Sequence, residues 1–160
     1  MKLHLLLAGL LAASLAAAGA DGPYDIKLLP TKAAPAASGH ARLVYAASPF
    51  GIAVTADGRA RYDVQVTAAG MPRADSSGAA VAHVAWAAST DLAKWERLGT
   101  VTNGTTTVGQ VDMNKFLLVI TAERDSTTLT HAGPTELHGT SPSGWLQSFL
   151  SHPLFRGIPQ

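Results

Sequence analysis

Strict alternation of apolar and polar side chains over residues 61–67 is the sequence feature that most restricts the fold of this chain. Tyr62, Val64 and Val66 are apolar, and the residues on either side of each are polar or charged. Successive side chains of a β-strand point to opposite faces of a sheet. The pattern therefore predicts an antiparallel strand with one face in a core and the other in water.

Short apolar or alternating runs that end in turn residues recur along the chain. Asp57-Gly58 and Asn103-Gly104 are hairpin turn signals, because glycine adopts a positive φ without steric cost. About seven or eight such runs with almost no helical period predict an all-β fold, an immunoglobulin-like antiparallel β-sandwich over residues 41–140. The expected strands cover residues 41–45, 51–55, 61–67, 81–87, 97–101, 105–111, 116–121 and 135–138.

The first twenty residues indicate export. Lys2 precedes an apolar run from Leu5 to Ala18, which ends in the small residues Ala18-Gly19-Ala20. This is the layout of a secretory signal peptide, and the run is short and alanine-rich for a membrane span. We expect residues 1–20 to be a signal peptide cleaved after Ala20. The product would be a periplasmic or secreted bacterial protein with no stable membrane span.

Charge and cysteine content exclude several classes of protein. The chain has 12 Lys and Arg against 11 Asp and Glu, and loss of Lys2 with the signal peptide would balance them. A balanced charge without a basic stripe argues against a nucleic-acid partner. The chain has no cysteine, so it has neither a disulfide framework nor a thiolate metal site. An exported domain of this kind must be held together by its core.

Residues 21–40 are expected to form an extended N-terminal arm. Prolines 23, 30 and 35 interrupt this range, and proline removes a backbone donor. Ile26, Leu28 and Leu29 still allow one short strand within the arm.

Residues 141–160 are expected to form a C-terminal amphipathic segment with a short helix. Ser143 is a suitable N-cap and Pro153 ends the helical spacing. A helix of about two turns is not stable alone in water, so its apolar face must dock on something. We expect this face to bind a protein partner or a second copy of the chain; the alternative is that it closes one end of the sandwich. The expected contact residues are Trp145, Leu146, Phe149, Leu150, Leu154 and Phe155.

Several short motifs between about residue 55 and residue 139 carry a family resemblance. They are Gly70-Met71-Pro72, His83-Val84-Ala85-Trp86, Leu98-Gly99-Thr100-Val101, and the run 116–123 leading to Ala132-Gly133-Pro134. With these motifs the segment resembles the extracytoplasmic C-terminal domain of anti-sigma-K factors of the RskA type. The resemblance implies an immunoglobulin-like sandwich, and its motifs are core and turn positions without chemistry. In that family a sigma-binding domain and a transmembrane helix precede the module. Here a signal peptide is expected, so the resemblance implies a stand-alone exported copy without sigma-factor inhibition.

The sequence offers little for catalysis or metal binding. Residues 139–144 do not form the Gly-x-Ser-x-Gly nucleophile elbow. His83, His131 and His138 are candidate ligands for copper or zinc, although no histidine pair has a ligand spacing and the fold would have to assemble the site. The function we expect is a non-catalytic exported binding or assembly module without a cofactor. The alternatives are a small periplasmic copper- or zinc-binding protein and a soluble ligand sensor.

Overall fold

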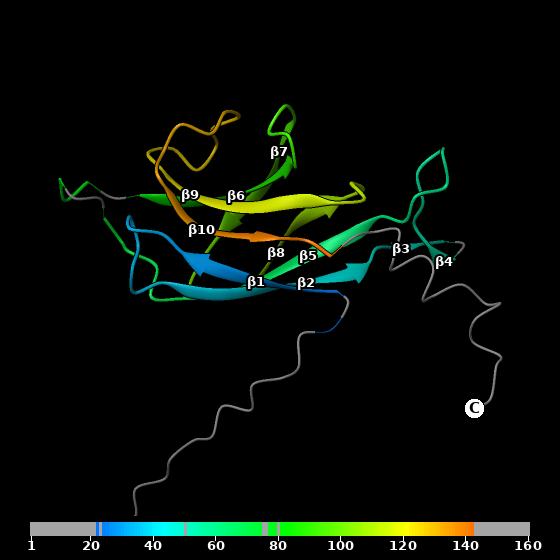
Figure 1. Ribbon diagram of the computed structural model, residues 1–160, viewed down its shortest axis with the longest axis horizontal. Helices are drawn as coiled ribbons and strands as arrows, with labels where there is room; N and C mark the ends of the chain where they lie inside the picture. The colour runs from blue at the N-terminus through cyan, green and yellow to red at the C-terminus, as the bar shows by residue number, and fades with distance from the viewer. Residues whose placement is uncertain (1–21, 23, 50, 75–76, 80, 143–160) are drawn as a thin grey trace, which may run out of the picture.

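The computed structural model describes residues 22, 24–49, 51–74, 77–79 and 81–142, whose regular secondary structure is all β (Figure 1). Within these residues no helix has the length and apolar character of a membrane span. The strands are β1 Asp25–Pro30, β2 Ser38–Tyr45, β3 Ala47–Ser48, β4 Gly51–Ile52, β5 Tyr62–Ala69, β6 Ala82–Ser89, β7 Trp95–Val101, β8 Gly104–Val111, β9 Phe116–Glu123 and β10 Thr135–Thr140.

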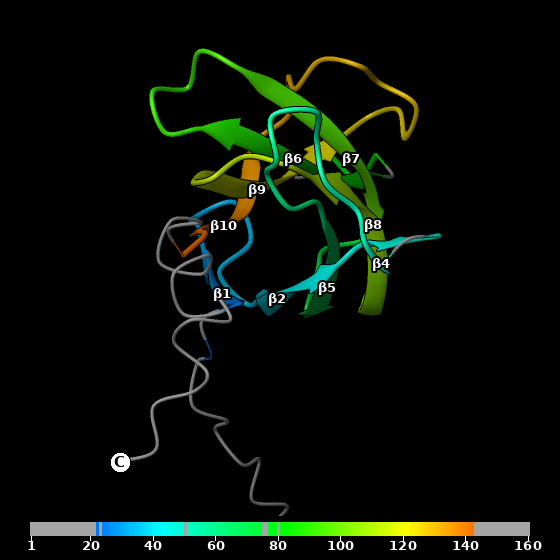
Figure 2. The same cartoon turned by 90° about the vertical axis from the view of Figure 1, so that its right-hand side faces the viewer.

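Eight strands form one antiparallel sheet in the order β7-β6-β9-β10-β1-β2-β5-β8. Strand β1 changes partner along its length, because residues 25–28 pair with β2 while Leu29 and Pro30 pair with β10. The sheet curls so that its two outer strands, β7 and β8, come into contact and the molecule is nearly barrel-shaped (Figure 2). The core lies inside this curled sheet.

The alternation that predicted a half-buried strand over residues 61–67 is confirmed in β5. Tyr62, Val64, Val66 and Ala68 are all buried, and the residues between them are only partly so. Strands β1, β9 and β10 add further side chains to the same core, and the largest fully buried ones are Ile26, Phe116, Leu118, Ile120 and Leu137.

Two glycines allow β7 and β8 to approach each other. A Cβ on Gly99 would lie 2.4 Å from the carbonyl oxygen of Val108, and one on Gly109 would lie 2.7 Å from that of Leu98. Gly104, at the turn between the two strands, has a φ of 104°. The turn expected at Asn103-Gly104 is therefore present, but it does not close a hairpin. β7 pairs with β6 and β8 pairs with β5, so the chain crosses here between the two edges of the sheet.

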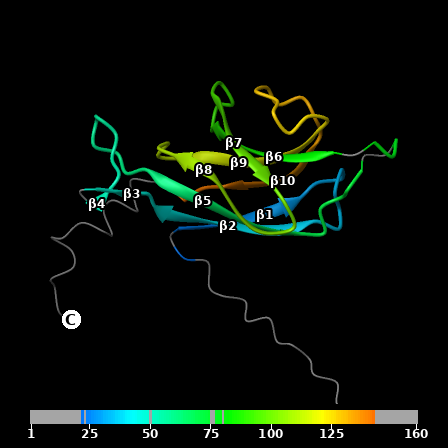
Figure 3. The same ribbon diagram turned by 180° about the vertical axis from the view of Figure 1, so that it is seen from behind.

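A second, two-stranded sheet of β3 and β4 extends beyond one end of the large sheet (Figures 1 and 3). We call residues 46–49 and 51–61 the finger. Its tip is the turn expected at Asp57-Gly58, with a φ of 83° at Gly58 and a 2.9 Å bond from Gly58 N–H to the Thr55 carbonyl. The strand expected over residues 51–55 is shorter than predicted: β4 covers only Gly51 and Ile52, and an isolated bridge joins Val54 to Ala60.

The all-β, antiparallel fold is thus confirmed, while the immunoglobulin-like sandwich stays a prediction. The short strand that the expected N-terminal arm allowed at Ile26, Leu28 and Leu29 is present as β1. It lies between β10 and β2, and Ile26 and Leu28 are buried in the core. The signal peptide over residues 1–20 and the short helix after Ser143 lie outside the described residues.

Candidate functional site

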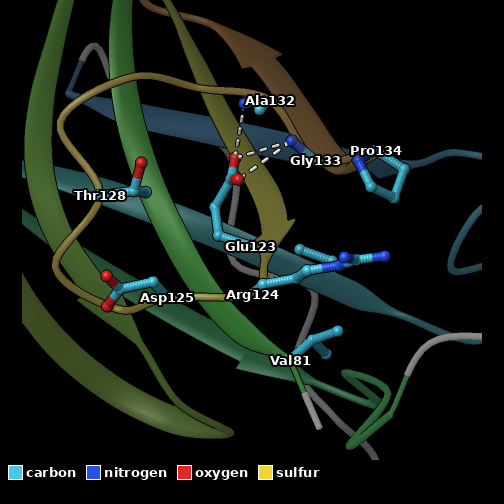
Figure 4. A pocket seen from close by; sticks show the side chains of 9 residues that line it. Val81, Glu123, Arg124, Asp125, Thr128, Ala132, Gly133 and Pro134 are labelled. Atoms are coloured by element: carbon cyan, nitrogen blue, oxygen red, sulfur yellow. Dashed lines mark hydrogen bonds between the residues drawn. The ribbon is translucent and has the colours of Figure 1, made fainter. Parts of the chain in front are cut away.

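A buried carboxylate organises the loop between β9 and β10, which we call the β9–β10 loop (residues 124–134). Glu123 is the last residue of β9 and is 4% exposed. Its Oε1 accepts hydrogen bonds from Thr121 Oγ1 at 2.6 Å and from the backbone N–H groups of Ala132 and Gly133 at 3.1 Å. Its Oε2 accepts a second bond from Gly133 N–H at 3.0 Å (Figure 4). Glu123 therefore ties the end of the loop to its beginning.

The hydrogen bonds decide the charge state of Glu123. Burial by itself raises the pKa of Glu123, but the bonds from Thr121, Ala132 and Gly133, together with the nearby His131, outweigh it and hold the pKa below its usual value. The carboxylate is ionised at neutral pH, as an acceptor of four hydrogen bonds should be.

Aromatic side chains fix the outer part of the β9–β10 loop. The ring of His131 stacks on that of Trp95, with centroids 3.7 Å apart and planes 16° apart. Trp86 packs edge-on against the same histidine at 6.0 Å and donates from Nε1 to Thr121 Oγ1 at 2.8 Å. Trp86, Thr121 and Glu123 thus form one chain of buried hydrogen bonds beneath the loop.

A second buried acid–base contact joins β6 to β10. His83 Nδ1 lies 2.6 Å from Glu136 Oε2, and the two side chains are 11% and 2% exposed. Strand β10 has one extra residue, Glu136, between the pairs Thr135–Thr121 and Leu137–Ile120. This extra residue is a β-bulge, which interrupts the alternation of inward and outward side chains along the strand. Glu136 and the next residue, Leu137, are therefore both buried.

A cavity of about 590 Å³ lies beside the β9–β10 loop (Figure 4). Its lining residues are Val81, Ala122, Glu123, Arg124, Asp125, Thr128, Ala132, Gly133 and Pro134. The second carboxylate in this set, Asp125, accepts hydrogen bonds from the backbone and the hydroxyl of Thr127, both at 2.8 Å. These bonds lower the pKa of Asp125, the backbone bond most. Both acids of the cavity are therefore occupied with their own loop.

The structure places the three candidate metal ligands in three different settings. His83 is paired with Glu136, His131 stacks on Trp95, and His138 is exposed on β10 opposite Leu29. In the part of the chain that the structure describes, no three His, Cys, Asp or Glu side chains gather closely enough to hold a metal ion. The copper or zinc site stays a prediction, and the structure does not bring His83, His131 and His138 together.

The six apolar residues expected to bind a partner, between Trp145 and Phe155, lie outside the described residues. The structure does show where that segment begins. Ser141 is 3% exposed and makes two hydrogen bonds with Phe116. The Ser141 N–H donates to the Phe116 carbonyl, and the Phe116 N–H donates to Ser141 Oγ, each at 2.9 Å. The chain is thus fixed at Ser141, the first residue of the predicted segment.

Sequence reasoning did not find the part played by Glu123. The sequence shows an acid just after an apolar run, close to Asp125, and such acids are ordinary in surface loops. The one available signal is the spacing to Gly133-Pro134, ten residues on, because a turn with exposed N–H groups needs an acceptor. This signal is too weak to name the pairing in advance.

Comparison of the chain with protein-family models, with curated proteins and with solved structures gave no match in any of the three. The resemblance to the anti-sigma-K factor domain therefore rests on the motifs of the sequence. The hydrogen bonds of Glu123 explain its burial: they stabilise the β9–β10 loop.

Proposed function

We propose that this chain is a non-catalytic exported binding or assembly module, an immunoglobulin-like domain of the kind that the resemblance implies. In this proposal the C-terminal segment, residues 141–160, docks onto a protein partner or a second copy of the chain. The observation that carries it is the position of Ser141. This residue directly follows the end of β10, at the same end of the sheet as the finger (Figures 1 and 3).

The finger presents apolar side chains at this end. Ile52 is 52% exposed and Val54 is 58% exposed. Exposed apolar side chains next to one another mark contact surfaces more often than isolated ones do. In this proposal the segment after Ser141, which is rich in Trp, Phe and Leu, supplies the other apolar side chains of the docking surface.

Three tyrosines line the same end beneath the finger. Tyr24, Tyr45 and Tyr62 have ring centroids 5.0 to 6.2 Å apart, and the hydroxyl oxygens of Tyr24 and Tyr45 lie 3.1 Å apart. Burial raises the pKa of Tyr62, so its hydroxyl stays neutral. Tyr62 belongs to the core, whereas Tyr24 and Tyr45 are only partly buried, and aromatic side chains with a polar tip are enriched in protein interfaces.

The buried acids support a non-catalytic role. Glu123 is fully hydrogen-bonded within the β9–β10 loop, and Glu136 is bonded to His83. A general acid or base needs a proton site that a substrate can reach. Glu123 and Glu136 instead make hydrogen bonds that hold the loop and join the strands.

Light scattering coupled to size-exclusion chromatography tests the proposal on the chain from residue 21 to 160 and on a truncation that ends at Pro142. We expect the longer chain to self-associate or to retain a partner from an extracytoplasmic extract, and the truncation to be a folded monomer that does neither. Trp145→Ala with Phe149→Ala should act like the truncation, whereas Leu129→Ser, on the β9–β10 loop, should change nothing.

Two results would contradict the proposal. In the first, the truncation keeps the same mass and the same partner. In the second, the truncation loses its cooperative thermal transition, which would assign the segment to the core.

A further inference from the structure

The cavity beside the β9–β10 loop differs from the docking surface proposed above and does not depend on it. It lies at the other end of β9, between the loop and the start of β6, and its volume of about 590 Å³ is in the range of small-molecule sites. Val81, Ala122 and Pro134 give it an apolar wall. The polar side chains decide which ligand it fits.

The acids of the cavity are not available to a cationic ligand. Glu123 has four donors from its own loop and its neighbouring threonine, and Asp125 is bonded to Thr127. Each acid also has a cationic or ionisable neighbour that lowers its pKa: His131 for Glu123 and Arg97 for Asp125. A bound ammonium group would have to compete with all of these contacts.

Arg124 is the charged side chain of the cavity that the fold leaves for a ligand. It is exposed, and none of the ion pairs among the described residues includes it. Figure 4 shows its side chain and that of Asp125 pointing in opposite directions, with Glu123 turned into the loop. The guanidinium group presents several N–H donors that match the two oxygens of a carboxylate.

We propose that this cavity binds a small organic carboxylate, with the acid group on Arg124 and a short aliphatic body against Val81, Ala122 and Pro134. The ligand is either a free carboxylic acid or the C-terminal carboxylate of a short peptide, since the two present the same group. The β9–β10 loop supplies a preformed wall, because Glu123 holds it at Ala132 and Gly133.

Nuclear magnetic resonance titration of the chain from residue 21 to 160 tests this site. The carboxylate probes are butyrate and hexanoate, and hexylammonium is the control with reversed charge. A pair of peptides, N-acetyl-Val-Ala and the same peptide with an amidated C-terminus, tests for recognition of a peptide terminus. We expect saturable shifts of the Gly133 and Arg124 amides with the carboxylates, tighter for hexanoate than for butyrate, and none with hexylammonium. A response to N-acetyl-Val-Ala that its amide lacks would assign the site to peptide termini; a response to hexanoate alone would assign it to free acids.

Arg124→Gln should weaken the binding of hexanoate about tenfold, the effect of losing one charge-assisted contact. Arg59→Gln, which removes an exposed arginine of the finger, should leave it unchanged. The proposal is overturned if no carboxylate gives a saturable shift up to about 50 mM, a Kd beyond any useful affinity. Equal binding by Arg124→Gln, or equal binding of hexylammonium, would overturn it as well.

Discussion

The β9–β10 loop and the finger leave opposite ends of the sheet and are held by different forces. The loop is closed from inside by Glu123, and its outer part is covered by the stack of His131 on Trp95. The finger is held mainly by backbone hydrogen bonds, such as those from Ala53 N–H to Ala46 and from Arg61 N–H to Ala53, and its Ile52 and Val54 stay more than half exposed. In the β9–β10 loop the buried carboxylate of Glu123 is fully hydrogen-bonded, whereas in the finger the apolar side chains of Ile52 and Val54 remain exposed for contact.

This difference separates the parts of the chain that determine stability from those that offer a surface. A buried carboxylate with several donors is expensive to disturb, because its removal leaves buried N–H groups unpaired. An exposed apolar side chain costs little to replace. Substitutions at Glu123 and Gly133 should therefore act on unfolding, and substitutions at the exposed Ile52 and Val54 on association.

Gly133→Ala should have the largest effect. An added Cβ would lie 1.8 Å from the carbonyl oxygen of Ala122, so the β9–β10 loop must move away from β9 and break its bonds to Glu123. We expect a loss of about 3 kcal/mol or more in the free energy of unfolding, measured by urea denaturation. Gly58→Ala is the matched control in the finger: its Cβ meets nothing within 4 Å, and only the φ of 83° is strained. It should cost about 1 kcal/mol. Equal losses at the two positions would contradict the comparison.

Glu123→Gln should rank second. The substitution keeps one acceptor oxygen but replaces the other by an NH₂ group, which faces the N–H donors of Ala132 or Gly133. We expect the free energy of unfolding at pH 7 to fall by about 2 kcal/mol. Asp57→Asn is the control, because Asp57 is an exposed acid of the finger that bonds Arg59 at 2.9 Å, and exposed pairs contribute little. A Glu123→Gln protein as stable as the wild type would mean that the loop needs no charged acceptor.

The same carboxylate should make stability depend on pH. Since the pKa of Glu123 is lower in the folded chain than the ordinary value of 4.5 for a glutamate, its stabilising effect is complete above that pH and is lost as the pH falls through the folded pKa. The stability difference between wild type and Glu123→Gln should therefore be constant from pH 7 to about pH 5 and shrink at lower pH. Urea denaturation at several pH values measures it. A difference that stays constant down to pH 3 would show that the carboxylate does not titrate with unfolding.

How far the sequence predicts this molecule depends on how local each signal is. The alternation in β5 needs only its own residues, and the strand was found where it was expected. Strand β1 was expected as part of an arm because of its flanking prolines. Its place between β10 and β2 depends on pairing with residues more than a hundred positions away, such as Leu29 with His138. The Asn103-Gly104 pair predicts a turn, but β7 pairs with β6 and β8 with β5, and no local pattern specifies these distant partners. The hydrogen bonds of Glu123 are likewise specified by the folded loop and not by any motif.

Ile52→Ser and Val54→Ser should have the smallest effect on stability and the clearest effect on association. These side chains are 52% and 58% exposed, so little apolar area returns to water on unfolding, and each change should stay within about 0.5 kcal/mol. If the end of the sheet that carries the finger is a docking surface, the double variant should self-associate less or lose its partner while it melts like the wild type. Leu129→Ser, at a position 83% exposed on the β9–β10 loop, is the control for lost surface hydrophobicity. Equal association of both variants and the wild type would remove the finger from the interface, and a loss in both would point to general surface hydrophobicity. A loss in the finger variant alone would show that apolar exposure at this end, and not at the other, serves binding.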